Sequence, residues 1–296
     1  MKTQSKKWII AAIVVFTTIT VLGVYFNKKD EPIVAKKIDT EISANYWSRD
    51  TNFFTLKDST NLAKLAKSVG LTLERNKGLD HPWSADTYIR YKDDQKVYWA
   101  VWDITEDKMI ICSENAAYNV YGASVPKVCV SAASLTYNGG KLQDKDWRNV
   151  IRLLVVSDNS VWGNVQNLAG KKGTVNHWAD SLEYSMRPEF NGGNSVNAFD
   201  MAIFWSDVCH NRFPGSEAIF KITSSCRTGT SRSRWSMPND VYMGGKTGTY
   251  GVTNHDCCWI QKGNKFYSIC VLTELGARGT EVISSMFRGL YEDYCK

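Results

Sequence analysis

The chain has 296 residues, of which 43% are hydrophobic, 12% aromatic and 22% charged. This composition excludes a disordered chain, a collagen-like chain and a protein with many membrane spans. The net charge of +6 arises mostly near the N-terminus, because seven lysines lie within the first 37 residues. The remainder is nearly balanced in charge, so we expect no nucleic-acid partner.

The N-terminal region carries a hydrophobic segment that predicts a membrane anchor. Residues 8–26 include no charged side chain, and 19 helical residues can cross the hydrocarbon core of a bilayer. No small-x-small cleavage site follows, which favours an uncleaved signal anchor over a cleaved signal peptide that would release a secreted or periplasmic protein. We expect residues 1–7 in the cytoplasm, a tether at 27–46 and one domain at 47–296.

Hydrophobic patterning beyond the tether predicts strands near both ends of the domain and helices between them. The expected helices cover residues 58–70, 124–137, 147–156, 161–168 and 281–291. The expected strands cover residues 87–91, 96–104, 109–112, 241–243, 256–261 and 266–273. This order predicts an α+β fold in which N- and C-terminal segments share one antiparallel sheet, with a helical region inserted between them.

Eight cysteines are an even number and a high one for a cytosolic enzyme of this size. They predict disulfide bonds and an oxidising compartment, which places the domain on the outer side of the membrane. Cys257 and Cys258 are neighbours on an expected strand, so their side chains face opposite sides of it. Cys129 lies in an expected buried helix, either as a small apolar residue or as half of a bridge.

Three short motifs follow one another along the chain: Ser124-Val-Pro-Lys127, Ser157-Asp-Asn159 and Lys246-Thr-Gly-Thr249. A single Ser-x-x-Lys match is weak evidence, but this one is the only match in the chain and begins an expected buried helix. At positions i and i+3, the hydroxyl of Ser124 and the amine of Lys127 lie on one helix face, where the amine can take the hydroxyl proton. Only a neutral lysine can do so, and burial together with the charge of Lys246 would lower its pKa.

In this combination and order, the motifs resemble those of the penicillin-recognising serine hydrolases, which include class A β-lactamases and D,D-peptidases. The resemblance covers about two thirds of the chain, from residue 91 to the C-terminus. The segments that carry it are 98–103, 123–133, 153–159, 232–238 and 246–254. It implies a β-lactamase/transpeptidase-like fold.

The resemblance also implies a role for each matching residue. Ser124 would be the nucleophile and Lys127 its base, while Ser157 would pass a proton to the leaving nitrogen and Lys246 would supply positive charge. The residues that would bind the substrate are Asn159, Thr247, Gly248, Thr249 and Arg232. The backbone N–H groups of Ser124 and Thr249 would form the oxyanion hole. No metal or cofactor is implied, and the four histidines have no metal-binding spacing.

Two departures from the family pattern bear on function. Ser124 and Ser157 are 33 residues apart, closer than is usual in the family, so we expect a shortened helical region and a more open cleft. Class A β-lactamases carry Glu-x-x-Leu-Asn after the second motif, and its glutamate activates the deacylating water. Here Arg187 stands in place of that glutamate, and a guanidinium cannot act as a base near neutral pH. Glu189 and Glu183 are the alternative bases.

Without the usual base, an acyl-enzyme formed with a β-lactam is expected to persist. The leading hypothesis is therefore a membrane-anchored D,D-peptidase that acts on D-Ala-D-Ala-type peptides of peptidoglycan. A class A-like β-lactamase that hydrolyses the antibiotic is the alternative. A second alternative is a non-hydrolytic sensor or binding module for the cell wall or for β-lactams.

Overall fold

The computed structural model describes residues 57–296, so the expected cytoplasmic segment, anchor and tether lie outside the described residues. Within 57–296, no helix combines the length and the apolar character that crossing a membrane requires. All eight cysteines and all three motifs fall inside this region.

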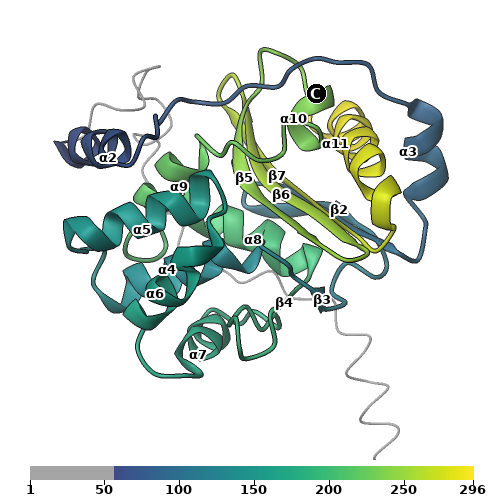
Figure 1. Cartoon of the computed structure of the whole chain (residues 1–296). Helices are drawn as coiled ribbons and strands as arrows, with labels where there is room; N and C mark the ends of the chain where they lie inside the picture. The colour runs from purple at the N-terminus through teal and green to yellow at the C-terminus, as the bar shows by residue number, and fades with distance from the viewer. Residues whose placement is uncertain (1–56) are drawn as a thin grey trace, which may run out of the picture. The chain divides into compact units, whose positions relative to one another are not determined.

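The described region contains helices throughout and strands mainly at its two ends (Figure 1). The helices are α2 (Lys57–Ser68), α3 (Ala85–Tyr91), α4 (Pro126–Tyr137), α5 (Asp144–Val155), η1 (Asn159–Val161), α6 (Trp162–Leu168), α7 (Thr174–Ser181), α8 (Ala198–Cys209), α9 (Ser216–Thr223), α10 (Ser233–Ser236), η2 (Gly276–Arg278) and α11 (Gly279–Tyr294). The strands are β1 (Val97–Asp103), β2 (Lys108–Cys112), β3 (Val120–Tyr121), β4 (Ser195–Val196), β5 (Tyr242–Tyr250), β6 (Thr253–Lys262) and β7 (Lys265–Thr273).

Five strands form one sheet in the order β2-β1-β7-β6-β5, and every neighbouring pair is antiparallel. Strand β1, from the N-terminal part of the domain, pairs with β7 from the C-terminal part. This pairing confirms the expected α+β fold with one sheet shared by both ends. The short strands β3 and β4 form a separate pair that joins the segment just before Ser124 to the segment just before α8.

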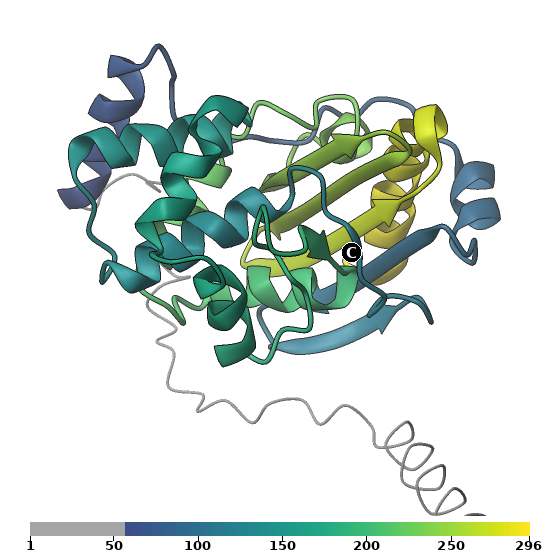
Figure 2. The same ribbon diagram turned by 60° about the horizontal axis from the view of Figure 1, so that its bottom comes forward.

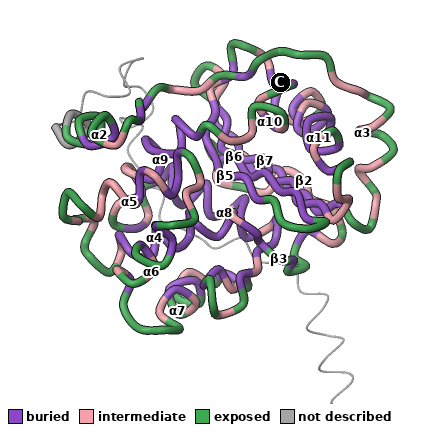
Figure 3. Tube along the Cα trace, viewed as in Figure 1, coloured by how far each residue is buried: buried purple, intermediate pink, exposed green. Residues whose placement is uncertain are grey.

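Helices cover both faces of the sheet (Figure 1), and strands β1, β5, β6 and β7 are mostly buried, whereas the edge strand β2 is exposed or half-buried (Figure 3). Helix α8 packs on β1, β6 and β7, and α11 packs on β6 and β7. The two adjacent cysteines of β6 show that these are opposite faces: Cys257 belongs to the apolar cluster that includes α4 and α8, and Cys258 to the one that includes α11. The inserted helices lie beside the sheet (Figure 2). Between α4 and Ser157, the chain forms a single helix, α5.

The predicted strand at 87–91 is wrong, because these residues form helix α3. The hydroxyl of Ser84 caps the helix by accepting a hydrogen bond from the N–H of Thr87 at 3.0 Å. Tyr88 then packs over Gly289 of α11, where an added Cβ would lie 2.3 Å from the tyrosine ring. Capping and packing against α11 thus outweigh the preference of these residues for extended structure.

The prediction of disulfide bonds is also wrong: all eight cysteines are free thiols in the structure. Seven of them are buried, and Cys129, Cys209 and Cys257 are part of the large apolar cluster around α4 and α8. They therefore behave as small apolar residues in the core. Because these cysteines form no disulfide bonds, their number does not support an oxidising compartment.

Candidate active site

Ser124 lies in a tight turn between β3 and α4, two residues ahead of the helix that it was expected to begin. The helix starts at Pro126, a residue whose fixed φ suits a first helical position. Ala123 has a φ of 49°, a left-handed conformation that costs energy for a residue with a side chain. The turn is held from outside by Asn194, whose carbonyl oxygen accepts a hydrogen bond from Gly122 N–H at 2.7 Å.

Lys127, in the first turn of α4, is completely buried, and its ammonium group is directed to the second motif. Its Nζ donates to the carbonyl oxygen of Ser157 at 2.7 Å, to Ser157 Oγ at 3.1 Å and to Asn159 Oδ1 at 2.5 Å. Burial, followed by the charge of Lys246, lowers the pKa of Lys127 to about 7. Among the described residues, no hydrogen bond joins the side chains of Ser124 and Lys127.

Ser157 follows α5 with a φ of 59°, and Asp158 caps the short helix η1 that comes next by accepting from Ser160 N–H. This sharp bend places Ser157 Oγ within 3.1 Å of Lys127 Nζ and 3.0 Å of Lys246 Nζ. When both amines are protonated, the Ser157 oxygen accepts from both of them, so its own hydrogen is available to a third group. This arrangement suits proton delivery to a substrate atom.

Lys246 and Gly248 bring strand β5 against the first two motifs. Lys246 is fully buried, its Nζ also donates to the carbonyl oxygen of Thr247 at 2.8 Å, and burial lowers its pKa to about 8. An added Cβ on Gly248 would lie 2.8 Å from Gly122 O and 3.1 Å from Ser124 N. The absence of a side chain at position 248 therefore allows β5 to approach the backbone of the Ser124 turn.

Arg232 joins the end of β5 to the start of β6. Its Nη1 donates to the carbonyl oxygens of Gly248 at 3.1 Å and His255 at 3.0 Å. Its Nη2 donates to the hydroxyl of Thr249 and, at 3.1 Å, to Asn254 Oδ1. Burial lowers the pKa of this guanidinium, which nevertheless stays charged near neutral pH. A fixed cation beside an exposed threonine hydroxyl is a suitable binding place for a carboxylate.

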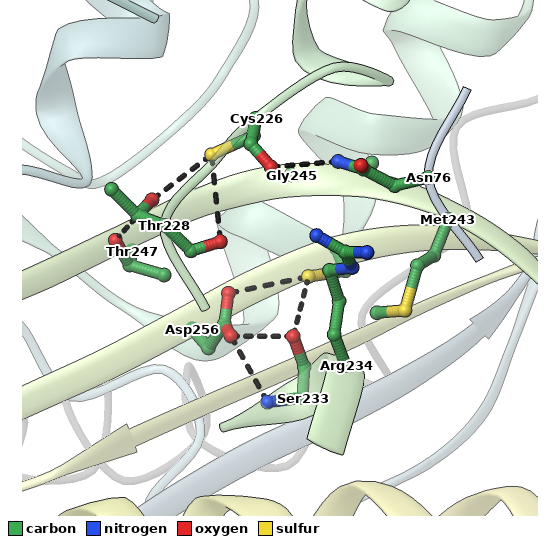
Figure 4. Close-up of a pocket in the computed structure, with 11 residues that line it drawn as sticks. Asn76, Cys226, Thr228, Ser233, Arg234, Met243, Gly245, Thr247 and Asp256 are labelled. Atoms are coloured by element: carbon green, nitrogen blue, oxygen red, sulfur yellow. Dashed lines mark hydrogen bonds between the residues drawn. The ribbon is translucent and has the colours of Figure 1, made fainter. Parts of the chain in front are cut away.

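A small cavity of about 10 Å³ is lined by Thr247 and other residues of β5 and β6, by Asn76, and by the segment at 226–234 (Figure 4). Thr247 Oγ1 donates to Thr228 Oγ1 at 2.7 Å, so this hydroxyl already has a protein partner. Asp256, which is 1% exposed, accepts from both the backbone N–H and the hydroxyl of Ser233. Asp256 thereby anchors the segment next to Arg232.

Sequence reasoning missed Thr228 and Asp256. No motif marks Thr228, and its partnership with Thr247 arises only when the segment folds over β5. Asp256 lies in an expected strand and pairs with Thr247. Its position could have marked it as a functional candidate, because a carboxylate in a buried strand needs hydrogen-bond partners.

The loop at 187–194 bears on the search for a deacylating base. Arg187 forms an ion pair with Asp180 at 2.9 Å, on α7. Glu189 is 1% exposed, and its Oε1 accepts a hydrogen bond from the N–H of Gly173 at 2.8 Å, immediately before α7. Phe190 packs against the Trp162 ring at a centroid distance of 4.4 Å. The ion pair of Arg187 and the hydrogen bond of Glu189 Oε1 thus reach α7 and the residue before it, while Glu189 Oε2 is buried without a hydrogen-bond partner among the described residues.

The site therefore brings together all nine residues expected to act on a substrate. Hydrogen bonds link Lys127, Ser157, Asn159 and Lys246 directly. Gly248 connects this group to the Ser124 turn, and Arg232 joins the end of β5 beside Thr249. Thr247 lies on the same strand, with its hydroxyl bonded to Thr228.

Solved structures of class A β-lactamases share this fold. An ancestral enzyme of the last common ancestor of Gram-negative bacteria is 17% identical, with a TM-score of 0.59 over 78% of this chain and 100% of that chain. The β-lactamase of Chitinophaga pinensis is 16% identical, with a TM-score of 0.59 over 71% of this chain and 97% of that chain. The enzyme of Sphaerobacter thermophilus is 15% identical, with a TM-score of 0.58 over 70% and 94%. The fold is therefore that of a class A β-lactamase-like serine hydrolase.

The sequence model of the Beta-lactamase enzyme family matches residues 138–294, and the chain belongs to this family. The match includes Ser157, Lys246 and Arg232, and it begins after Ser124 and Lys127. No curated protein matches the chain.

Proposed function

We propose that this protein is an acyl-serine enzyme that cleaves D-Ala-D-Ala-type amide bonds of peptidoglycan precursors and is acylated by β-lactams. The observation that carries the proposal is the shared contact of two buried lysines with the hydroxyl of Ser157, beside the turn that holds Ser124. In acyl transfer, a neutral amine must remove a proton from the nucleophile and a hydroxyl must return one to the leaving nitrogen.

In the proposed acylation step, the hydroxyl oxygen of Ser124 attacks the substrate carbonyl while Lys127 takes its proton. A pKa of about 7 leaves much of Lys127 neutral at physiological pH, as a base requires. The proton then passes from Lys127 to Ser157 Oγ, which donates its own hydrogen to the leaving nitrogen as the carbon–nitrogen bond breaks. Lys246 supports this transfer as the second donor to the same oxygen.

Substrate binding is assigned to the edge of β5 and to Arg232. The backbone N–H groups of Ser124 and Thr249 would hold the oxyanion, since Gly248 lets β5 approach the Ser124 turn. Arg232 and the hydroxyl of Thr249 would bind the terminal carboxylate of the substrate. Asn159 would hold the amide of the substrate. This residue is exposed, and its side chain lies at the site because it accepts a hydrogen bond from Lys127.

The proposed preference for peptidase over β-lactamase activity rests on deacylation. Arg187 replaces the expected glutamate, and Glu189 holds the backbone before α7. A β-lactam adduct on Ser124 would therefore hydrolyse slowly. The alternative, a β-lactamase, is favoured by the likeness of the fold to solved β-lactamases. The second alternative, a sensor or binding module, requires an acylation site that does not turn over.

One experiment separates these functions. Purified protein is mixed with penicillin, the intact mass is followed over time, and hydrolysis of nitrocefin and of a D-Ala-D-Ala peptide is measured in parallel. We expect a stoichiometric adduct on Ser124 that lasts far longer than one catalytic cycle, and its absence in Ser124→Ala. Rapid nitrocefin turnover without a lasting adduct would establish the β-lactamase alternative. A lasting adduct without cleavage of a D-Ala-D-Ala peptide would establish the sensor.

We also propose that residues 8–26 anchor the chain in the cell membrane, with the catalytic domain on the extracytoplasmic side. The length of the uncharged run supports this location, as does a substrate that belongs to the cell wall. Fractionation of cells that express the full chain, with protease added to intact spheroplasts, tests it. Membrane-bound protein degraded from outside is expected, whereas soluble cytoplasmic protein would contradict it.

A further inference from the structure

A second pocket, with a volume of about 470 Å³, lies where the segment at 82–84, helix α10 and the first turns of α11 meet. Helices α10 and α11 pack side by side on the face of the sheet away from α8 (Figure 1). Ser231 lines this pocket and directly precedes Arg232 of the candidate active site. The pocket is therefore separate from the candidate active site, and the two are adjacent along the chain at residues 231 and 232.

Tryptophan side chains form part of the pocket wall. Trp235 is 39% exposed, a large fraction for this residue type, and the ring of His81 stacks on it at a centroid distance of 3.8 Å. A backbone hydrogen bond of 2.8 Å from His81 N–H to the carbonyl oxygen of Trp235 reinforces this stacking. Trp83, half-buried, contributes a second indole to the lining. The pocket thus offers an aromatic surface that is held in place before any ligand binds.

Besides the two tryptophans, the wall contains Pro82, Ala277 and polar residues, of which only Glu281 is charged. Ser231, Thr280 and Ser284 contribute hydroxyls from α11 and the segment before α10. Ser284 is only 5% exposed, and its Oγ has no hydrogen-bond partner. A buried hydroxyl without a partner costs free energy, and a ligand that bonded to it would recover that loss. The lining contains no lysine or arginine, which disfavours an anionic ligand.

We propose that this pocket binds a neutral saccharide, with an apolar sugar face on Trp235 and its hydroxyl groups bonded to Ser284, Thr280 and Glu281. Pyranose rings combine an apolar face of C–H groups with a rim of hydroxyls, which matches a wall of indoles and serines. The volume falls within the range of small-molecule sites. The identity of the sugar rests on the proposed function: a cell-wall peptide is attached to a glycan of N-acetylated hexosamines.

Calorimetric titration of the full-length protein with N,N′,N″-triacetylchitotriose tests the proposal. We expect saturable binding with a dissociation constant of about 1 mM or tighter. Trp235→Ala and Ser284→Ala are each expected to weaken it at least about fivefold, or about 1 kcal/mol. Tyr137→Ala, which removes an aromatic ring that is 47% exposed at the far end of α4, is the matched control and is expected to leave binding unchanged.

Penicillin labelling of Ser124 in the same samples keeps the two proposals distinguishable. Normal labelling of Trp235→Ala shows that this variant is folded, and Ser284→Ala provides a smaller change if it is not. Undetectable binding to the unmodified protein at several millimolar sugar, or binding unaffected by both variants, would overturn the saccharide site. Sugar binding without penicillin labelling would retain the saccharide site and reject the proposed acyl-serine chemistry.

Discussion

Lys127 and Lys246 reach the same atom from different parts of the fold: the Nζ of each lysine donates a hydrogen bond to Ser157 Oγ, at 3.1 and 3.0 Å. Both amines are buried, and the pKa of each is lowered, to about 7 for Lys127 and about 8 for Lys246. The charge of Lys246 contributes to the lowered pKa of Lys127. The third motif therefore influences how readily the first can accept a proton.

Replacing Lys246 by glutamine is expected to shift the pH dependence of penicillin acylation to higher pH. Lys127 must be neutral to act as a base, so the wild-type rate should rise through pH about 7. Removal of the neighbouring charge raises the pKa of Lys127, which moves this rise upward. Acylation rates measured across pH check the shift. Lys265→Gln alters an exposed lysine and should keep the wild-type profile; an unshifted profile in K246Q would contradict the coupling.

Gly248→Ala is expected to slow acylation by about a hundredfold. The new Cβ would lie 2.8 Å from Gly122 O and 3.1 Å from Ser124 N, so β5 must move away from the backbone that would hold the oxyanion. The overpacking should also cost about 1–3 kcal/mol of stability. Gly163→Ala, in helix α6 with no atom within 4 Å of its new Cβ, is the matched control and should acylate normally. Equal rates in the two variants would refute the close approach of β5.

Glu189→Gln is expected to leave the lifetime of the penicillin adduct unchanged. The carboxylate of Glu189 is buried and accepts a hydrogen bond from Gly173 N–H, which gives it a structural partner. Replacement should instead lower stability by about 1 kcal/mol. Glu183→Gln, on the exposed loop before Tyr184, provides the comparison. Mass spectrometry of the adduct over time measures both lifetimes. A much longer-lived adduct in either variant would identify that glutamate as a deacylating base.

The stability of the Asp256→Asn variant relative to the wild type is expected to increase as pH rises. Burial raises the pKa of Asp256 above its usual range, so the folded protein holds this proton more tightly than the unfolded chain does. The wild type accordingly loses stability from this group as pH increases from the ordinary aspartate range through the raised pKa. Asparagine cannot titrate. Thermal unfolding of both proteins between acidic and neutral pH should give a Tm difference, variant minus wild type, that increases with pH; a constant difference would exclude this effect.

Much of the fold was predictable because local patterns and final packing agree. Strand β1, helices α5 and α6, and the pairing of N- and C-terminal strands follow from periodicity and chain order. Helix α3 was mistaken for a strand because its aromatic residues favour extended structure, whereas a serine cap and contact with Gly289 make it helical. The strand β5 extends to Tyr250 because pairing with β6 continues past the glycines.

The candidate site could be located from the sequence, because Ser124, Lys127, Ser157 and Lys246 stand in motifs whose order and spacing are specific. The contacts among these residues, in contrast, became visible only in the folded chain. Lys127 bonds to Ser157 and not to Ser124, the cysteines remain free thiols, and Glu189 holds the backbone before α7. These relationships join residues distant in sequence, and their energies depend on burial and direction, which no spacing along a chain defines.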